Sequence, residues 1–302
     1  MKRGNHIFLP LAIACLLASG CAGSSGARSG AHAEPVPGRS ILLSVLADRI
    51  YVLDPETGAV QTLVEGLTDY QGGFATWAPD HDRFAYGDGG IVIVDANKGS
   101  GTTLVAHQGL SMPAWSPDGL SLAYGDGRNL WVTPVDHLQA RYLAMPLTLG
   151  PLSMAWQPSG SIAFEGLELV CHIPKGCSST DGREVWTILP DGTGLTRLTH
   201  LGHAGGPKWS PDGRRLLFIR YLGGGEAQGE LWVVNADGSG ARRLTDGSDI
   251  VAADWSPHGT QMAIVRRGAP AGELRLWLAD ENGQHARSIG PAFAGTSATV
   301  DW

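Results

Sequence analysis

Short apolar runs alternate with turn-forming residues along almost the whole chain, and one unit of this pattern recurs. Each copy has a Trp, a Ser-Pro-Asp-Gly-like segment and then an apolar run, as at 115–124 and 209–218. In Ser-Pro-Asp-Gly, Pro sets φ at the second corner of a type I turn and Gly leaves it. The apolar runs on either side therefore predict two strands of a β-hairpin.

The repeat continues with two further predicted strands. Weaker copies of the unit begin at Trp77, Trp156 and Trp255, and Thr-Val-Asp-Trp at 299–302 starts a sixth. Third strands are predicted around Trp131, Trp186, Trp232 and Trp277, and fourth strands at the Arg-Leu-Thr segments 197–199 and 243–245. The spacings between first-strand Trp residues are 38, 41, 53, 46 and 47 residues. Four strands at about 40–45 residues per repeat are the period of a β-propeller blade.

The two ends of the chain supply complementary parts of one more blade. Residues 40–45, 49–54 and 60–63 align with second, third and fourth strands, with Tyr51 where other repeats have Trp. Residues 298–302 align with a first strand. Joining them closes the ring, whereas an open ring would leave two exposed sheet edges. We predict an all-β, six-bladed β-propeller over residues 40–302, with the sixth blade built from both termini.

The unit W-S-P-D-G-x-x-[IL]-[AF]-[FY] resembles the propeller repeat of the TolB family. Asn-Ala-Asp-Gly at 235–238, followed by Arg-Leu-Thr at 243–245, extends the match. The resemblance covers about residues 40–302 and implies the fold, but the same repeat serves many roles. TolB carries an α/β domain before its propeller, for which this chain has no residues left. By analogy we expect a propeller that binds an envelope protein, without a role inferred in the Tol–Pal machinery.

The first twenty residues resemble a bacterial lipoprotein signal. Lys2 and Arg3 form a positive start, and 7–17 is an apolar stretch too short to span a bilayer. Leu-Ala-Ser-Gly-Cys at 17–21 resembles a lipobox, although Ala18 stands where Leu is commonest. We expect Cys21 to be acylated; the alternative is an ordinary signal peptide cut elsewhere. The Gly-, Ser- and Pro-rich segment 21–39 predicts a flexible tether.

The remaining cysteines and the net charge bear on which ligands the protein could bind. Cys171 and Cys177 predict a disulfide that closes a small loop in an exported protein. A zinc site is the alternative, but two Cys with one nearby His form an incomplete ligand set. Loss of the signal leaves a net charge of −9, and Lys and Arg form no cluster. Nucleic-acid binding therefore has no electrostatic basis here.

Binding is predicted on one end of the disc. Ser-Pro-Asp-Gly and Ala-Asp-Gly turns share one end, where we expect their Asp residues to be structural. Connections between second and third strands and between blades share the other end, and they vary in sequence, as functional loops on a rigid scaffold do. The disulfide-closed loop would lose less entropy on binding. The binding-face candidates are Tyr70, His107, His172, Lys175, His203, Tyr221, Arg266 and Arg267.

Catalytic signals are weak. There is no G-x-S-x-G, and the propeller uses the whole mature chain. His200 and His203 lie three positions apart on a predicted loop. Two histidines at this spacing are usually exposed to solvent, and the alternative is a metal site. Asp254 and Asp301 lie on first strands and could reach the central channel, where some lactonase-like propellers hold a metal ion. We predict no catalytic residue, metal or cofactor.

Two functions are consistent with these features of the sequence. The first is a monomeric, lipid-anchored envelope scaffold that binds a protein; the sequence does not name that partner. The alternative is a small-ligand-binding or metal-dependent hydrolytic propeller. Clustered acidic or His side chains in the channel would favour the alternative, and an apolar or blocked channel would favour the scaffold.

Overall fold

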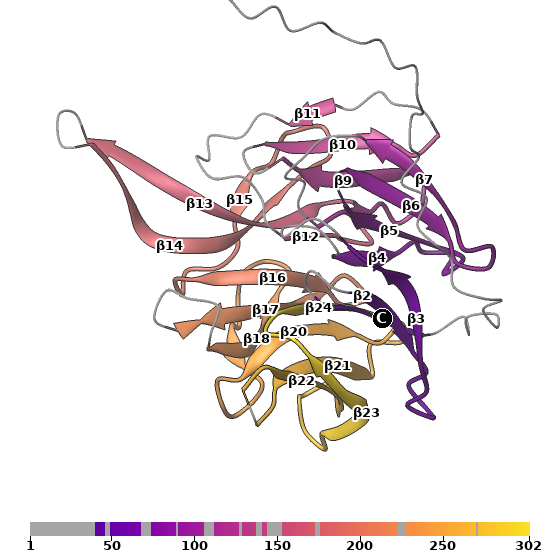
Figure 1. Cartoon of the computed structure of the whole chain (residues 1–302). Coiled ribbons are helices and arrows are strands. Elements are labelled where there is room, and N and C mark those ends of the chain that lie inside the picture. The colour runs from indigo at the N-terminus through magenta and orange to yellow at the C-terminus, as the bar shows by residue number, and fades with distance from the viewer. Residues whose placement is uncertain are drawn as a thin grey trace, which may run out of the picture.

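The protein is a six-bladed β-propeller, as the repeat predicts (Figure 1). The computed structural model describes residues 40–45, 49–67, 74–88, 90–105, 112–126, 129–136, 141–143, 153–172, 176–222, 228–269 and 271–302. These residues form six antiparallel sheets of four strands each. No helix among them is long and apolar enough to cross a membrane.

Each of the first three blades is a meander from an inner to an outer strand. Blade 1 contains β4 (Ala75–Trp77), β5 (Arg83–Gly87), β6 (Ile91–Asp95) and β7 (Ser100–Val105). Blade 2 contains β8 (Ala114–Trp115), β9 (Ser121–Gly125), β10 (Leu130–Pro134) and β11 (Arg141–Leu143). Blade 3 contains β12 (Met154–Trp156), β13 (Ile162–His172), β14 (Gly176–Ile188) and β15 (Thr196–Arg197).

The remaining three blades follow the same order of strands. Blade 4 contains β16 (Ala204–Trp209), β17 (Arg215–Tyr221), β18 (Gly229–Asn235) and β19 (Arg242–Arg243). Blade 5 contains β20 (Ile250–Trp255), β21 (Gln261–Arg267), β22 (Glu273–Asp280) and β23 (Arg287–Ala294). Blade 6 contains β24 (Ala298–Asp301), β1 (Ile41–Val45), β2 (Arg49–Leu53) and β3 (Val60–Glu65).

Both ends of the chain build blade 6, which confirms the predicted closure. β24 is the inner strand and pairs antiparallel with β1, from Leu42 opposite Asp301 to Val45 opposite Ala298. Leu42, Val45, Ala298 and Val300 are all buried. Because each sheet edge at the junction is paired, the ring has no open seam there.

Trp77 and Trp115 each bond to the preceding blade. The Trp77 indole N–H donates to the carbonyl of Ser40 in blade 6, at 3.0 Å, and that of Trp115 donates to Thr76 in blade 1, at 3.2 Å. The Arg83 guanidinium of blade 1 lies 5.1 Å from the centre of the Trp115 ring of blade 2. These contacts combine apolar burial with directional bonds between sheets that could not bury their own faces.

The repeated turns use their Asp side chains internally, as predicted. In blade 2 the Ser116 hydroxyl and the Leu120 amide both donate to Asp118, and Gly119 has a φ of 68°. The blade 1 turn departs from this pattern because His81 occupies the Gly position with a φ of 56°. A residue with a Cβ is strained in that region, so this turn differs locally from its copies.

Blade 3 carries a long hairpin that projects from the disc (Figure 1). β13 pairs with β14 along its length, whereas β12 covers only residues 162–164 of β13 and β15 covers only 186–187 of β14. The register places Cys171 directly opposite Cys177, although their side chains lie outside the described part of the structure. The disulfide therefore stays a prediction, made at positions whose backbones are paired.

Candidate functional site

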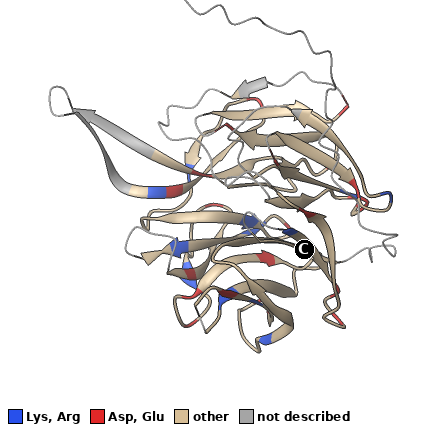
Figure 2. Ribbon diagram, viewed as in Figure 1, with Lys and Arg blue, Asp and Glu red and all other residues tan. Residues whose placement is uncertain are grey.

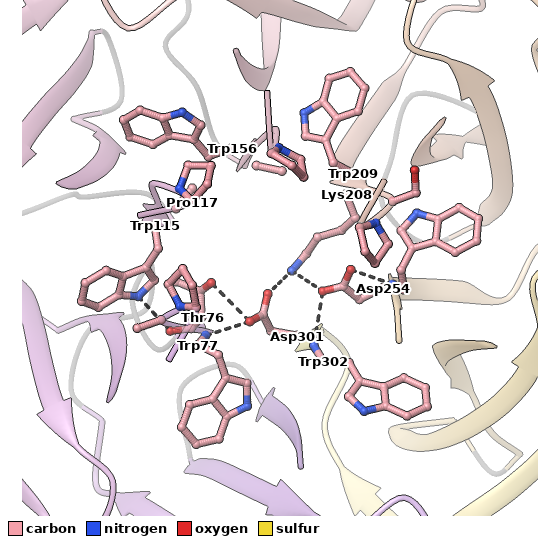
Figure 3. A pocket seen from close by; sticks show the side chains of 18 of the residues that line it. Thr76, Trp77, Trp115, Pro117, Trp156, Lys208, Trp209, Asp254, Asp301 and Trp302 are labelled. Atoms are coloured by element: carbon pink, nitrogen blue, oxygen red, sulfur yellow. Dashed lines mark hydrogen bonds and ion pairs between the residues drawn. The ribbon is translucent and has the colours of Figure 1, made fainter. Parts of the chain in front are cut away.

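All six inner strands end near a Trp at the same mouth of the central channel. The residues directly before these Trp residues are Thr76, Ala114, Ala155, Lys208, Asp254 and Asp301. All six of them line one cavity at this mouth (Figure 3). Four prolines of the repeated turns, Pro79, Pro117, Pro158 and Pro211, also line it, so the cavity belongs to the end of the disc that carries those turns.

Lys208 joins the two acidic side chains of the mouth. Its Nζ lies 2.9 Å from Asp254 Oδ2 and 2.5 Å from Asp301 Oδ1, so one ammonium connects blades 4, 5 and 6 (Figure 3). The side chains are 22%, 11% and 14% exposed, respectively. Charge-assisted bonds of this kind are stronger than neutral ones, particularly where water is largely removed.

The remaining carboxylate oxygens also have donors. Asp301 Oδ2 accepts from the Trp77 amide at 2.7 Å and from the Thr76 hydroxyl at 3.3 Å, which extends the network into blade 1. Asp254 Oδ1 accepts from the Trp255 amide at 2.7 Å. All four carboxylate oxygens are therefore engaged, as buried charge requires.

The buried triad has perturbed proton affinities. Burial raises the pKa of Asp254 to about 7 because Lys208 offsets burial only in part and Asp301 adds to the rise. Burial alone would lower the pKa of Lys208, but the two carboxylates outweigh it and raise that pKa above its usual range. The ammonium stays charged, so the triad has a net charge of −1 when Asp254 is ionised and is neutral when Asp254 is protonated.

We expect Asp254→Asn to gain stability relative to the unchanged protein as the pH rises. The pKa of Asp254 is about 7 in the folded chain and has an ordinary value of 3.8. Stability from the protonated carboxyl is thus complete below about pH 4 and is lost through about pH 7. Urea unfolding measures this effect. The free energy of unfolding of the variant minus that of the unchanged protein should be larger at about pH 8 than at about pH 5, by on the order of 1–3 kcal/mol.

Asp212→Asn provides the control for this titration. Bonds from the Ser210 hydroxyl and the Arg214 amide lower the pKa of Asp212, so its contribution is present above its ordinary pKa and is lost on acidification. Between about pH 5 and about pH 8, Asp212→Asn should therefore keep a constant difference in stability from the unchanged protein, whereas the difference for Asp254→Asn should change with pH. A constant difference for both variants would mean that Asp254 is ionised throughout this range.

The cavity above the triad has a volume of about 400 Å³. Trp and Pro make up half of its lining residues. Figure 3 shows the labelled Trp rings pointing away from the opening, while Lys208, Asp254 and Asp301 meet within it. Pockets that bind small groups are typically concave, largely apolar and supplied with a few convergent polar groups, with volumes of about 300–1,000 Å³. The mouth has these properties.

The predicted binding-face residues lie elsewhere where they are described. His203 precedes β16 and is exposed, and its carbonyl accepts from the Tyr221 amide at 2.8 Å. The Arg266 guanidinium makes two bonds of 2.9 Å to Asp249, and the Arg267 amide donates to the Asp249 carbonyl. His203 and Tyr221 are thus adjacent, as are Arg266 and Arg267, at the end of the disc opposite the channel mouth.

Other predicted residues fall outside the part of the chain that the structure describes. These are Cys21, Tyr70, His107 and Lys175. The backbone of His172 ends β13, opposite Gly176 of β14. Binding by the variable face therefore stays a prediction.

The sequence predicts that Asp254 and Asp301 reach the channel, but Lys208 was missed. The signal was present, because Lys208 precedes Trp209 just as Asp254 precedes Trp255 and Asp301 precedes Trp302. Its ammonium lies between the carboxylates, where a metal bound by both would have to lie. Among the described residues, no group of three His, Cys, Asp or Glu is arranged to hold a metal ion.

Charges elsewhere are mixed in sign. Figure 2 shows Lys and Arg interspersed with Asp and Glu over the described blades. Several form local pairs, such as Arg197 with the buried Glu184 and Arg243 with the buried Glu230. The described surface thus offers no broad basic face for a nucleic acid.

The six-bladed propeller is similar in structure to two TolB proteins. The structure superimposes on TolB from Acinetobacter baumannii with a TM-score of 0.67 and 14% identity, covering 87% of this chain and 66% of that one. It matches a putative TolB from Agrobacterium tumefaciens with a TM-score of 0.62 and 20% identity, covering 86% and 91%. At these identities the similarity establishes the shared fold, and this chain spans about two thirds of the Acinetobacter protein.

An enzyme is also similar in structure to this chain. Oligogalacturonate lyase in complex with manganese matches with a TM-score of 0.52 and 17% identity, covering 80% of this chain and 70% of the lyase. Comparison of the sequence with protein families and with curated proteins finds no match. The fold is therefore compatible with both binding and catalysis.

Proposed function

We propose that this protein is a lipid-anchored scaffold of the bacterial cell envelope, and that it binds a protein partner at the channel mouth. The observation that carries the proposal is the cavity of about 400 Å³, which is lined by Trp and Pro residues together with the triad. A concave apolar surface with a few fixed polar groups offers burial and orientation to an inserted segment. A rigid ring loses little conformational entropy when it binds.

The envelope location rests on the N-terminal sequence. A lipid on Cys21 would hold the protein at a membrane, and the segment 21–39 would let the propeller reach a partner beyond the surface. The shared fold with TolB supports a binding role by analogy.

A metal-dependent hydrolytic propeller is the second candidate. The similarity to a manganese-bound lyase and the paired Asp254 and Asp301 favour it. It would require Lys208 to leave both carboxylates before a cation could bind there. All four carboxylate oxygens already have donors, so the side chains present suit the scaffold better.

Capture of the partner should depend on the mouth. The double variant Pro117→Glu with Pro158→Glu places two new carboxylates at exposed positions that line the cavity on blades 2 and 3. We expect at least a tenfold loss of the partner captured from envelope extracts. With the purified partner, the affinity should fall at least tenfold, which is about 1.4 kcal/mol. The melting temperature and β-sheet circular dichroism should show that the variant is folded.

The matched variant tests the opposite face. Tyr221→Glu with His203→Asn changes two residues there, and Asn tolerates the positive φ of 57° at position 203. We expect capture to be retained. Loss confined to this second variant would move the docking site to the variable face and reject the mouth.

A further inference from the structure

A second cavity lies between the outer strands of blades 4 and 5, which are neighbours in the ring (Figure 1). Its volume is about 290 Å³, close to the lower end of the range of about 300–1,000 Å³ for pockets that bind small molecules. It shares no lining residue with the cavity at the channel mouth. The lining comes from the chain after β19, from β21 and β22, and from the turn that follows β22: Thr245, Asp246, Ile264, Arg266, Trp277 and residues 283–286.

The space exists because blade 5 lacks an aromatic residue that three other blades have. In blades 2, 3 and 4 the residue paired across the strands with the third-strand Trp is Tyr124, Phe164 or Phe218. In blade 5 the residue paired with Trp277 is Ile264. The Phe218 ring stacks on its Trp with the ring centres 6.3 Å apart. Because an Ile side chain is smaller than an aromatic ring, blade 5 has room beside Trp277 for one ring that the chain does not itself supply.

A buried hydroxyl in the wall of this cavity has no partner. Thr245 is 7% exposed, and its Oγ1 makes no hydrogen bond within the described structure. The corresponding hydroxyl of blade 3, on Thr199, donates to Glu184. In blade 4 the corresponding carboxylate, Glu230, pairs with Arg243 at 2.8 Å instead. A buried polar group without a partner costs stability, and a ligand that bonds to it would recover that cost.

Other polar groups around the cavity are also available to a ligand. The side chains of Asp246 and Gln284 are exposed and make no hydrogen bond or ion pair with the described residues, and the same holds for the Trp277 indole N–H. An indole N–H donates, a carboxylate accepts, and an amide or a hydroxyl can do both. The cavity therefore offers donors and acceptors together, next to one aromatic ring.

The charges of the wall favour an uncharged ligand. The Arg266 guanidinium makes two bonds of 2.9 Å to Asp249, and its central carbon lies 5.7 Å from the centre of the Trp277 ring. This guanidinium occupies the position over the ring that a ligand cation would take. A ligand anion would instead meet the unpaired carboxylate of Asp246, while the positive charge of Arg266 is already compensated.

We propose that this cavity binds one uncharged sugar ring, with the C–H face of a pyranose against Trp277 and its hydroxyls bonded to Thr245, Asp246 and Gln284. The face of an aromatic ring is electronegative, so it attracts C–H groups that neighbouring oxygens polarise. Sugar hydroxyls both donate and accept, which matches the mixed polar groups of the wall. The inference goes beyond the scaffold function, because it gives the side of blades 4 and 5 a carbohydrate site of its own.

Four simple sugars test the site on the purified protein: the methyl glycosides of glucose, galactose, mannose and N-acetylglucosamine. The readout is the indole N–H signal of Trp277 in an NMR titration, assigned by its loss in Trp277→Phe. We expect at least one glycoside to shift this signal with a Kd of about 1 mM. The corresponding methyl uronide, which carries a carboxylate, and phenol, which has an aromatic ring and one hydroxyl, should each bind at least tenfold more weakly. No binding of any glycoside at ten times the expected Kd, or tighter binding of the uronide or of phenol, would overturn the proposal.

Two variants locate the sugar in this cavity. Ile264→Phe supplies the ring that the other blades carry, so it should fill the space and weaken binding more than tenfold, whereas the control Ile264→Leu should retain binding. Thr245→Val removes the buried hydroxyl without changing the shape of the side chain. It should weaken binding while raising the melting temperature, because the unpaired polar group is gone. If Ile264→Phe does not fold, Thr245→Val decides. Unchanged sugar binding in the folded variants would place the sugar elsewhere and reject the site.

Discussion

Removal of residues 297–302 is expected to prevent the propeller from folding to a stable state. The deletion takes away β24, the inner strand of blade 6, and leaves one edge of β1 unpaired from Leu42 to Val45. It also removes the buried Val300 and the Asp301 carboxylate that Lys208 binds. The loss should greatly exceed the ~1 kcal/mol of a typical substitution.

Thermal unfolding and size-exclusion chromatography measure this effect. We expect a lower melting temperature by far more than the few degrees of a point change, together with aggregation through the exposed edge. Deletion of Trp302 alone is the control, since β24 ends at Asp301 and keeps its pairing with β1. An unchanged melting temperature after the six-residue deletion would show that the termini do not share a blade.

The fold could be predicted because the information is local and repeated. A Trp, a Pro-fixed turn and an apolar run recur along the chain, and each copy specifies the same hairpin without reference to distant residues. Closure followed from complementary strand counts at the two ends, and the pairing of β24 with β1 confirms it. Repeats allow the whole architecture to be inferred from one unit.

The site could be predicted only in part because its contacts join distant residues. Asp254 and Asp301 were placed at the channel from their strand positions, but Lys208 lies 46 residues from the first and 93 from the second. Which side chains meet across a channel depends on the ring geometry. The sequence position before each Trp identifies the candidates, and the structure identifies the pairs.

The repeated turns also enclose a cavity, which the sequence of a single repeat does not indicate. Their Asp residues are structural, as in Asp118, so the sequence predicts no binding role for these turns. Similar turns arranged around an axis nevertheless enclose a concave volume, lined by their Pro and Trp side chains. The cavity is a property of the ring that no single repeat contains.

Replacement of Lys208 by Met is expected to produce the largest loss of stability of any single change at the mouth. It would leave Asp254 and Asp301, 11% and 14% exposed, without their shared cation. Removing one member of a buried ion pair costs about 3–5 kcal/mol because the other charge is left uncompensated. Urea unfolding near neutral pH should show a loss of this order, and acidification should reduce it by protonating the carboxylates.

A second substitution tests whether charge is the cause. Lys208→Met combined with Asp254→Asn removes one of the stranded charges, so the double variant should be more stable than Lys208→Met alone. Lys98→Met is the matched control, because Lys98 pairs with Asp95 while 75% exposed and its melting temperature should hardly change. If Lys208→Met were as stable as the unchanged protein at neutral pH, the ammonium would not hold the carboxylates, and the mouth would be free to take up another cation.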